Sequence, residues 1–440
     1  MLNVTITPHR EFLPANAPEQ KLFLMLKLRP TKEVASSRPV TTFVFVIDTS
    51  GSMYEDAALG KTKIDLVRES LYELIHRNNL TQNDRISLVR FDESASTIIG
   101  LTPAIQIGQL ENAIAKLTDL GDSTMMGLGM RQALNILSVQ DMTSRRALIF
   151  TDGHTFDEDR CQEIAQEFAT SGTPITALGF GDEFNEDLLT YISDTTGGRC
   201  FHVVPGNATG RDIAIADLSK AIFEEFSQAQ QEVINNLKLT VKTVQGVKLT
   251  RIVRAYPDQA EFPLTQEPYP IGTAVANDDT IFILEFTIQS RTASRVRIAQ
   301  LGLTYDVPGK NRRGELPPQN LVAEFVLGQS GAAQVDQNVM GYVQQCNISQ
   351  LINEATRVAE RNPQEADRLL ETAKRMTVKI GNAAMTQSLN EAQDELRKTR
   401  NISAGTRKTV KMGAKGKTVK MGGDINDELS EEQIRQISGT

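Results

Sequence analysis

The arrangement of hydrophobic and polar positions changes character several times along the chain. Between residues 20 and 30, leucines occupy every second position, which is typical of a strand with one buried face. From residue 41 onward, apolar runs such as 42–47 alternate with segments whose apolar residues recur every three or four positions. This alternation is typical of a mostly parallel sheet covered by helices on both faces. We therefore predict a doubly wound α/β domain over residues 41–230.

Period-two alternation returns over residues 231–330, where turn-forming sequences such as 277–279 and 308–309 separate the apolar segments. This spacing predicts an antiparallel β-sandwich. The strands predicted in residues 1–40 show the same period-two alternation of apolar residues. We therefore expect them to join the sandwich, so that the α/β domain is inserted in or beside it.

The C-terminal quarter of the chain is predicted to be helical at first and then flexible. Residues 333–400 carry two apolar stripes at helical spacing, broken at Asn362-Pro363, and we predict an α-helical hairpin there. Residues 401–440 lack apolar periodicity and contain a Lys-Thr-Val-Lys-Met-Gly repeat at 408–413 and 417–422. This composition predicts a flexible tail.

Composition excludes several classes of function and location. The net charge is −8 and there is no tryptophan, so the chain as a whole gives no case for nucleic-acid binding. The three cysteines are odd in number and far apart, which argues against a disulfide framework and favours a reducing, cytoplasmic location. We expect neither a signal peptide nor a transmembrane segment, because no apolar run is long enough.

Oxygen-bearing side chains follow or precede the predicted elements at three separate places. One group ends the strand 42–47, one precedes the helix that starts near residue 127, and one follows the strand 146–151; together they supply Asp48, Ser50, Ser52, Thr124 and Asp152. Ligands of open α/β sheets bind beyond the carboxyl ends of the strands. Carboxylates and hydroxyls suit hard cations, so the sequence predicts a site for Mg²⁺, or for Mn²⁺ or Ca²⁺.

Residues 48–52 taken alone have a simpler interpretation as a helix-entry loop, because Ser and Asp are common capping residues. The two further groups favour the metal site. The segment Phe-Val-Ile-Asp-Thr-Ser-Gly-Ser-Met at 45–53 then resembles the first motif of the metal-ion-dependent adhesion site of the von Willebrand factor type A (VWA) family. The resemblance covers about 42–225, and it implies a Rossmann-like VWA fold in which the five residues ligate the metal directly or through water. The flanking regions resemble bacterial cytoplasmic members of this family more loosely.

A divalent ion held by two carboxylates and neutral hydroxyls keeps a water position that a partner's Asp or Glu can replace. Apart from His154, the sequence offers no acid or base beside the site, so we predict docking and not an enzyme. The leading hypothesis is a metal-dependent interaction scaffold. The alternatives are an auxiliary subunit of a MoxR- or chelatase-type AAA+ ATPase machine and, less favoured, a metal-dependent hydrolase.

Two further features are candidate sites. Cys200 and His202 are two residue types that zinc uses, but a packed thiol and a surface histidine are the preferred interpretation. Thr409 and Thr418, one in each tail repeat, are candidate phosphosites, against the simpler reading of the tail as a solvated linker. Together with the family resemblance, they suggest partners such as a Ser/Thr kinase, a phosphatase or a forkhead-associated-domain protein.

Overall fold

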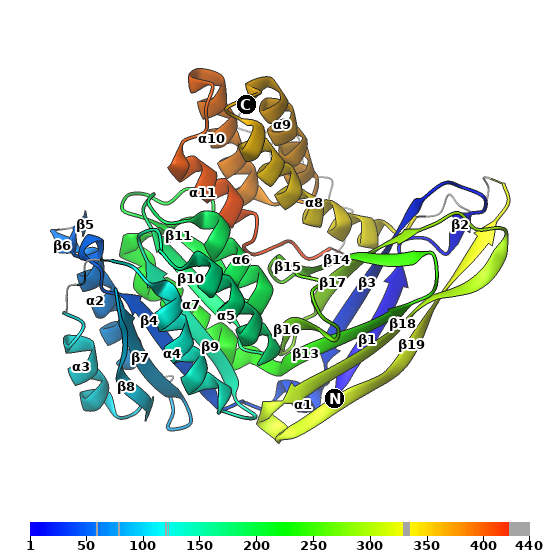
Figure 1. Ribbon diagram of the computed structural model, residues 1–440. Coiled ribbons are helices and arrows are strands. Elements are labelled where there is room, and N and C mark those ends of the chain that lie inside the picture. The colour runs from blue at the N-terminus through cyan, green and yellow to red at the C-terminus, as the bar shows by residue number, and fades with distance from the viewer. Residues whose placement is uncertain (59, 78–79, 119–120, 122, 329–334, 422–440) are drawn as a thin grey trace.

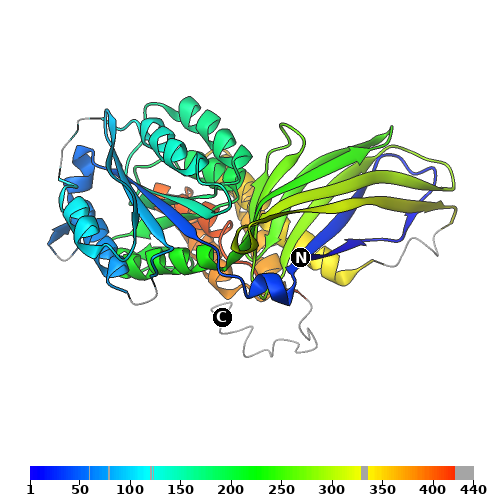
Figure 2. The ribbon, with the colours of Figure 1, turned by 90° about the horizontal axis from the view of Figure 1, so that it is seen from below.

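The structure is a computed structural model that describes residues 1–440 except 59, 78–79, 119–120, 122, 329–334 and 422–440. It has three parts, an α/β domain, a β-sandwich and a group of C-terminal helices (Figure 1). Seen from below, the α/β domain and the sandwich lie side by side, with the C-terminal helices against their junction (Figure 2).

The α/β domain is built on a seven-stranded sheet of order β12-β11-β10-β9-β4-β7-β8. Its strands are β4 (Thr41–Asp48), β7 (Arg85–Phe91), β8 (Ala95–Pro103), β9 (Ser144–Thr151), β10 (Ile175–Phe180), β11 (Cys200–Val204) and β12 (Ile213–Ala214). All pair in parallel except β8, which is antiparallel to β7. Every residue of β4 is buried, as the continuous apolar run predicts for a central strand.

Helices cover both faces of this sheet. One apolar core contains residues of α2 (Lys63–Ile75), α3 (Ile107–Ala115) and α7 (Leu218–Gln231). A second core, on the opposite face, contains residues of α4 (Met126–Ser138), α5 (Glu158–Thr170) and α6 (Glu186–Thr196). Short elements complete the domain: η1 (Gly51–Tyr54), β5 (Asp56–Ala58), β6 (Lys61–Thr62) and η2 (Ile215–Asp217). The predicted doubly wound α/β class is confirmed.

The sandwich consists of two five-stranded sheets, β1-β3-β17-β14-β15 and β16-β13-β18-β19-β2. The N-terminal strands are β1 (Leu2–Pro8), β2 (Phe12–Pro14) and β3 (Gln20–Pro30), followed by the short helix α1 (Lys32–Ala35). The later ones are β13 (Glu232–Thr243), β14 (Val247–Tyr256), β15 (Ala260–Phe262), β16 (Tyr269–Val275), β17 (Thr280–Ile288), β18 (Ser294–Val307) and β19 (Arg312–Val326), with η3 (Pro308–Lys310) between the last two.

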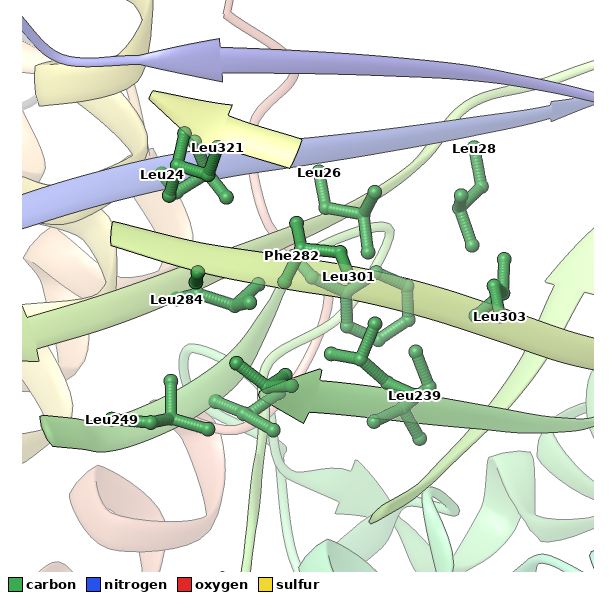
Figure 3. Packing of buried hydrophobic residues seen from close by; sticks show 14 of the residues in the cluster. Leu24, Leu26, Leu28, Leu239, Leu249, Phe282, Leu284, Leu301, Leu303 and Leu321 are labelled. Atoms are coloured by element: carbon green, nitrogen blue, oxygen red, sulfur yellow. The ribbon is translucent and has the colours of Figure 1, made fainter. Parts of the chain in front are cut away.

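The N-terminal strands enter both sheets of the sandwich. β3 pairs antiparallel with β17, and β2 pairs in parallel with β19. The buried leucines of β3 face those of β18 across the core (Figure 3). The α/β domain therefore interrupts the sandwich in sequence, which confirms the predicted insertion.

The C-terminal region differs from the prediction. It contains α8 (Gln337–Val358), α9 (Pro363–Lys379), α10 (Ala383–Thr399) and α11 (Ala404–Gly413). The break at Asn362-Pro363 is correct, but the predicted two-helix hairpin over 333–400 is wrong. A second break lies at Gly381-Asn382, where the glycine has φ of 73° and the Asn382 side chain caps α10.

The flexible tail predicted for 401–440 is also wrong for residues 401–421, and residues 422–440 lie outside the described part of the chain. Beyond α11, the chain runs between the α/β domain and the sandwich (Figure 1). There Lys415 pairs with Asp194 of α6 at 2.7 Å, and the Thr418 hydroxyl donates to the Ala255 carbonyl at 2.7 Å. In the parts of the chain that the structure describes, no helix is long and apolar enough to cross a membrane.

Candidate metal site

The predicted site lies where neighbouring strands end. Asp48 is the last residue of β4, and Asp152 directly follows β9, the strand beside it. Ile47 pairs with Phe150 in the parallel register, which brings the two carboxylates to the same edge of the sheet. The topology thus supplies the convergence that the strand-end rule predicts.

Three of the predicted side chains form a connected group. The Ser52 hydroxyl donates to Asp152 Oδ1 at 2.7 Å, and the Ser50 and Ser52 hydroxyl oxygens are 3.3 Å apart. Ser50 and Asp152 are buried, and Ser52 is half-buried. Two loops that are 100 residues apart in sequence therefore bring three side-chain oxygen donors within hydrogen-bonding distance of one another.

Asp48 is fully buried and is held by its neighbours. Its Oδ2 accepts from the Thr151 hydroxyl at 2.7 Å, and its Oδ1 accepts from the Ser50 backbone N–H at 2.9 Å. Burial raises the pKa of Asp48 to about 6, although these hydrogen bonds act against the shift. A buried carboxylate of this kind is stabilised in its charged form by a nearby cation.

Thr124 reaches the site from a third loop. Its carbonyl accepts from the Phe156 N–H at 3.0 Å and from the Thr155 hydroxyl at 3.1 Å, so its loop is fastened to the loop that carries Asp152. Thr124 is buried, and within the described residues its hydroxyl is not hydrogen-bonded to the other four members. Hence hydrogen bonds connect four of the predicted residues with one another, whereas the Thr124 carbonyl is bonded to residues that follow Asp152 in its loop.

Lys63, at the first position of α2, also lies at the site, although the sequence pattern does not predict it. Its ammonium lies 2.6 Å from Asp152 Oδ2 and donates to the Ser52 carbonyl at 3.2 Å, and Glu55 is 3.3 Å away. Burial would lower the pKa of Lys63, but the bonds to Asp152 and Glu55 outweigh it and raise the pKa. Lys63 is therefore a cation at neutral pH. No motif at this spacing pointed to it.

Asp92 was also missed, although the strand-end rule would have found it. It directly follows β7, and its Oδ2 lies 3.3 Å from the Thr49 hydroxyl. A Cβ added to Gly121 would lie 2.3 Å from the Asp92 Cβ, so only glycine permits this approach. The Gly121 carbonyl in turn accepts from the Gly51 N–H at 3.0 Å. Asp92 thus shapes the loops that carry the predicted ligands.

The donor set fits a hard divalent cation. Two carboxylates and three hydroxyls are oxygen donors only, and no group of three or more His, Cys, Asp or Glu suited to a metal occurs within the described ranges. Asp48, Ser50, Ser52, Thr124 and Asp152 could hold such an ion once the Lys63 ammonium releases Asp152. His154 is exposed beside this loop.

The other candidates from sequence take different places. His202 is buried, so the predicted surface histidine is wrong; Cys200 is a packed thiol, as expected. The Thr409 hydroxyl lies inside the fold, donating to Asp212 Oδ2 at 2.7 Å and lying 3.3 Å from His202 Nδ1. Both candidate phosphosites therefore belong to packed segments and not to a free tail.

Comparison with known proteins agrees with this architecture. Residues 43–213 match the model of the von Willebrand factor type A domain, and residues 337–420 match that of the Sll0103-like, C-terminal alpha-helical domain. The chain is 22% identical to the uncharacterized protein sll0103 of Synechocystis over 92% of this chain and 94% of that protein.

Solved structures share the whole fold. A von Willebrand factor type A protein from Catenulispora acidiphila matches with a TM-score of 0.76 and 16% identity, covering 94% of this chain and 97% of that one. The ArnB paralog VWA2 from Sulfolobus acidocaldarius matches with a TM-score of 0.60 and 16% identity, covering 94% and 98%. The chain thus carries a von Willebrand factor type A domain, followed after the sandwich strands by a Sll0103-like C-terminal α-helical domain.

Proposed function

We propose that this protein is a docking module that captures a partner's carboxylate on a divalent cation, and that Mg²⁺ is the leading candidate for this cation. The observation that carries the proposal is the convergence of Ser50, Ser52 and Asp152 within hydrogen-bonding distance at the edge of the sheet. The cation, when bound, supplies an open coordination position that prefers a charged oxygen ligand.

The residues around the ligands prepare the site for a cation. Thr151 and the Ser50 N–H orient the Asp48 carboxylate, and Ser52 orients that of Asp152. The hydroxyl donors carry no charge, so two carboxylates alone balance a divalent ion. A partner's Asp or Glu can then approach without repulsion from further acids among the five ligands.

The charges around the site favour binding over catalysis. The titratable side chains within contact of Asp152 include Lys63, whose raised pKa keeps it protonated and unfit to act as a base. His154, the other candidate for a general base, is exposed in the loop that follows Asp152. We therefore infer that the site holds a partner and does not turn over a substrate.

Phe156 gives this site a second contact for a protein. Its side chain is 80% exposed, four residues after Asp152, which is unusual for so large an apolar group. It is flanked by two fixed residues: Thr155 accepts from the Met126 N–H at 2.9 Å, and Asp157 accepts from the Gly127 N–H at 3.1 Å. A rigidly presented aromatic side chain beside a charged centre is typical of an interaction hot spot.

The test is metal-dependent capture. Immobilised wild-type protein is incubated with cell lysate in Mg²⁺ or in EDTA, beside Ser50→Ala and beside the exposed control Ser138→Ala of α4. We expect proteins that bind wild type and the control in Mg²⁺ only, and that Ser50→Ala does not retain. A bound set that is identical with EDTA contradicts metal docking, and co-purified ATPase activity would favour the AAA+ alternative.

A further inference from the structure

A cavity of about 220 Å³ lies away from the metal site, at the junction of the α/β domain and the C-terminal helices. β11, β12 and α7 form one side of it, and the end of α11 with the turn that follows forms the other. Its lining combines apolar side chains with basic ones: Phe201, Ile213, Met412, Arg199, Arg211 and Lys417. Ligand cavities commonly occupy such junctions.

Arg211 is the residue that sets this cavity apart. Its Nη2 donates to Asn382 Oδ1 at 3.0 Å, while its Nε is buried without a hydrogen-bond partner. Among the residues that the structure describes, no carboxylate lies within ion-pair distance of it. Burial alone lowers its pKa to about 10, so it is still a cation at neutral pH. A half-buried guanidinium without an ion-pair partner loses part of its hydration and gains no counter-charge in return.

The acids that line the same cavity are already engaged. Asp212 accepts from the Thr409 hydroxyl at 2.7 Å and lies 3.2 Å from His202. Glu225 pairs with Arg199 and with Arg146, and Glu224 lies 3.9 Å from Lys417. Each acid of the lining thus has a partner other than Arg211, and Arg211 is the cation of the lining for which no ion pair is found within the described residues.

The turn at Gly413–Gly416 lies against the Arg211 side chain. A Cβ added to Gly416 would lie 2.9 Å from Arg211 Nη1. The Arg211 guanidinium therefore lies between this turn and Asn382, and it lines the cavity without a carboxylate partner among the described residues that would compete with an oxyanion.

We propose that this cavity binds a small organic anion, whose phosphate or carboxylate group pairs with Arg211 and whose apolar part contacts Phe201, Ile213 and Met412. Such a ligand supplies the ionic partner that Arg211 lacks within the described residues. It would also bridge the α/β domain to the turn after α11, and so it would stabilise the packing of the C-terminal segment.

The experiment is isothermal titration of the full chain with phenyl phosphate, inorganic phosphate and benzoate at constant ionic strength. Wild type is compared with Arg211→Met, with Ala221→Leu, which fills the cavity and keeps the arginine, and with the exposed control Arg295→Gln. Circular dichroism and the melting temperature establish that each variant is folded.

We expect saturable binding of at least one of these anions, tighter than about 1 mM. Affinity should fall by about 10- to 100-fold in Arg211→Met, as for the loss of a charged hydrogen bond, and should fall in Ala221→Leu. Arg295→Gln and the metal-site variant Ser50→Ala should bind as wild type does. Absence of saturable binding by all three anions, or binding that Arg211→Met retains, overturns the proposal.

Discussion

Lys415→Met tests whether the lysine-rich C-terminal segment is built into the fold. The Lys415 ammonium lies 2.7 Å from Asp194 of α6, and the two side chains are only 8% and 15% exposed. Burial raises the pKa of Asp194, and the charge and hydrogen bond of Lys415 act against that shift and favour the charged carboxylate. Removing the ammonium leaves a buried carboxylate without its cation.

The expected cost follows from that burial. Breaking one partner of a buried ion pair costs about 3–5 kcal/mol. If amides of α11 exchange with solvent by local opening, their protection should fall by about 100- to 3,000-fold. Hydrogen exchange followed by mass spectrometry of peptides covering 404–413 measures this directly. Replacing both partners, Asp194→Asn with Lys415→Met, should restore most of the protection.

Lys417→Met is the matched control, two residues away. Its side chain is 73% exposed and its ammonium lies 3.9 Å from Glu224, so the loss should be below about 1 kcal/mol. If Lys415→Met and Lys417→Met leave α11 exchanging at the same rate, the segment is not packed as described and the reasoning fails.

Three further predictions concern the site and the C-terminal segment. Phe156→Ala should weaken partner binding by about 5- to 100-fold and leave metal affinity unchanged, whereas Val139→Ala, 73% exposed, should do neither; equal partner binding by both would contradict a docking role. Lys63→Met should tighten Mn²⁺ binding by about tenfold, because a competing cation is removed from Asp152; weaker binding would show that Lys63 supports the site. Burial would raise the pKa of Glu186, but its own backbone N–H, Arg407 and Lys408 lower it to about 2. Its contribution to α11 docking is therefore complete above about pH 4.5 and is lost between 4.5 and 2, so α11 protection should fall in this window, and Glu186→Gln should flatten that dependence.

The metal-binding residues could be predicted because a single rule places them. Asp48 and Asp152 follow apolar runs, and the carboxyl ends of parallel strands meet at one edge. Lys63 escaped because nothing local marks it: it begins an amphipathic helix, and its partner Asp152 is 89 residues away in sequence. Asp92 obeyed the rule and was overlooked.

The C-terminal segment was mispredicted for a different physical reason. Its lysines lack apolar periodicity, which is typical of a solvated chain. In the structure their charges are matched by acids of α6, with Lys408 at 3.2 Å from Glu186 and Lys415 at 2.7 Å from Asp194. Because these partners are more than 200 residues apart in sequence, neither the local hydrophobic pattern nor the composition of the segment can predict that ion pairs order it.

Binding of Mn²⁺ followed by electron paramagnetic resonance tests the central claim most directly, since it requires no knowledge of the partner. Wild type is compared with Asp48→Ala, with Ser50→Ala and with the exposed control Ser138→Ala. We predict a single saturable ion in wild type and in the control, competed by Mg²⁺, with affinity at least about tenfold weaker in both site variants. Equal Mn²⁺ affinity in all four proteins would contradict a metal held by Asp48, Ser50, Ser52, Thr124 and Asp152.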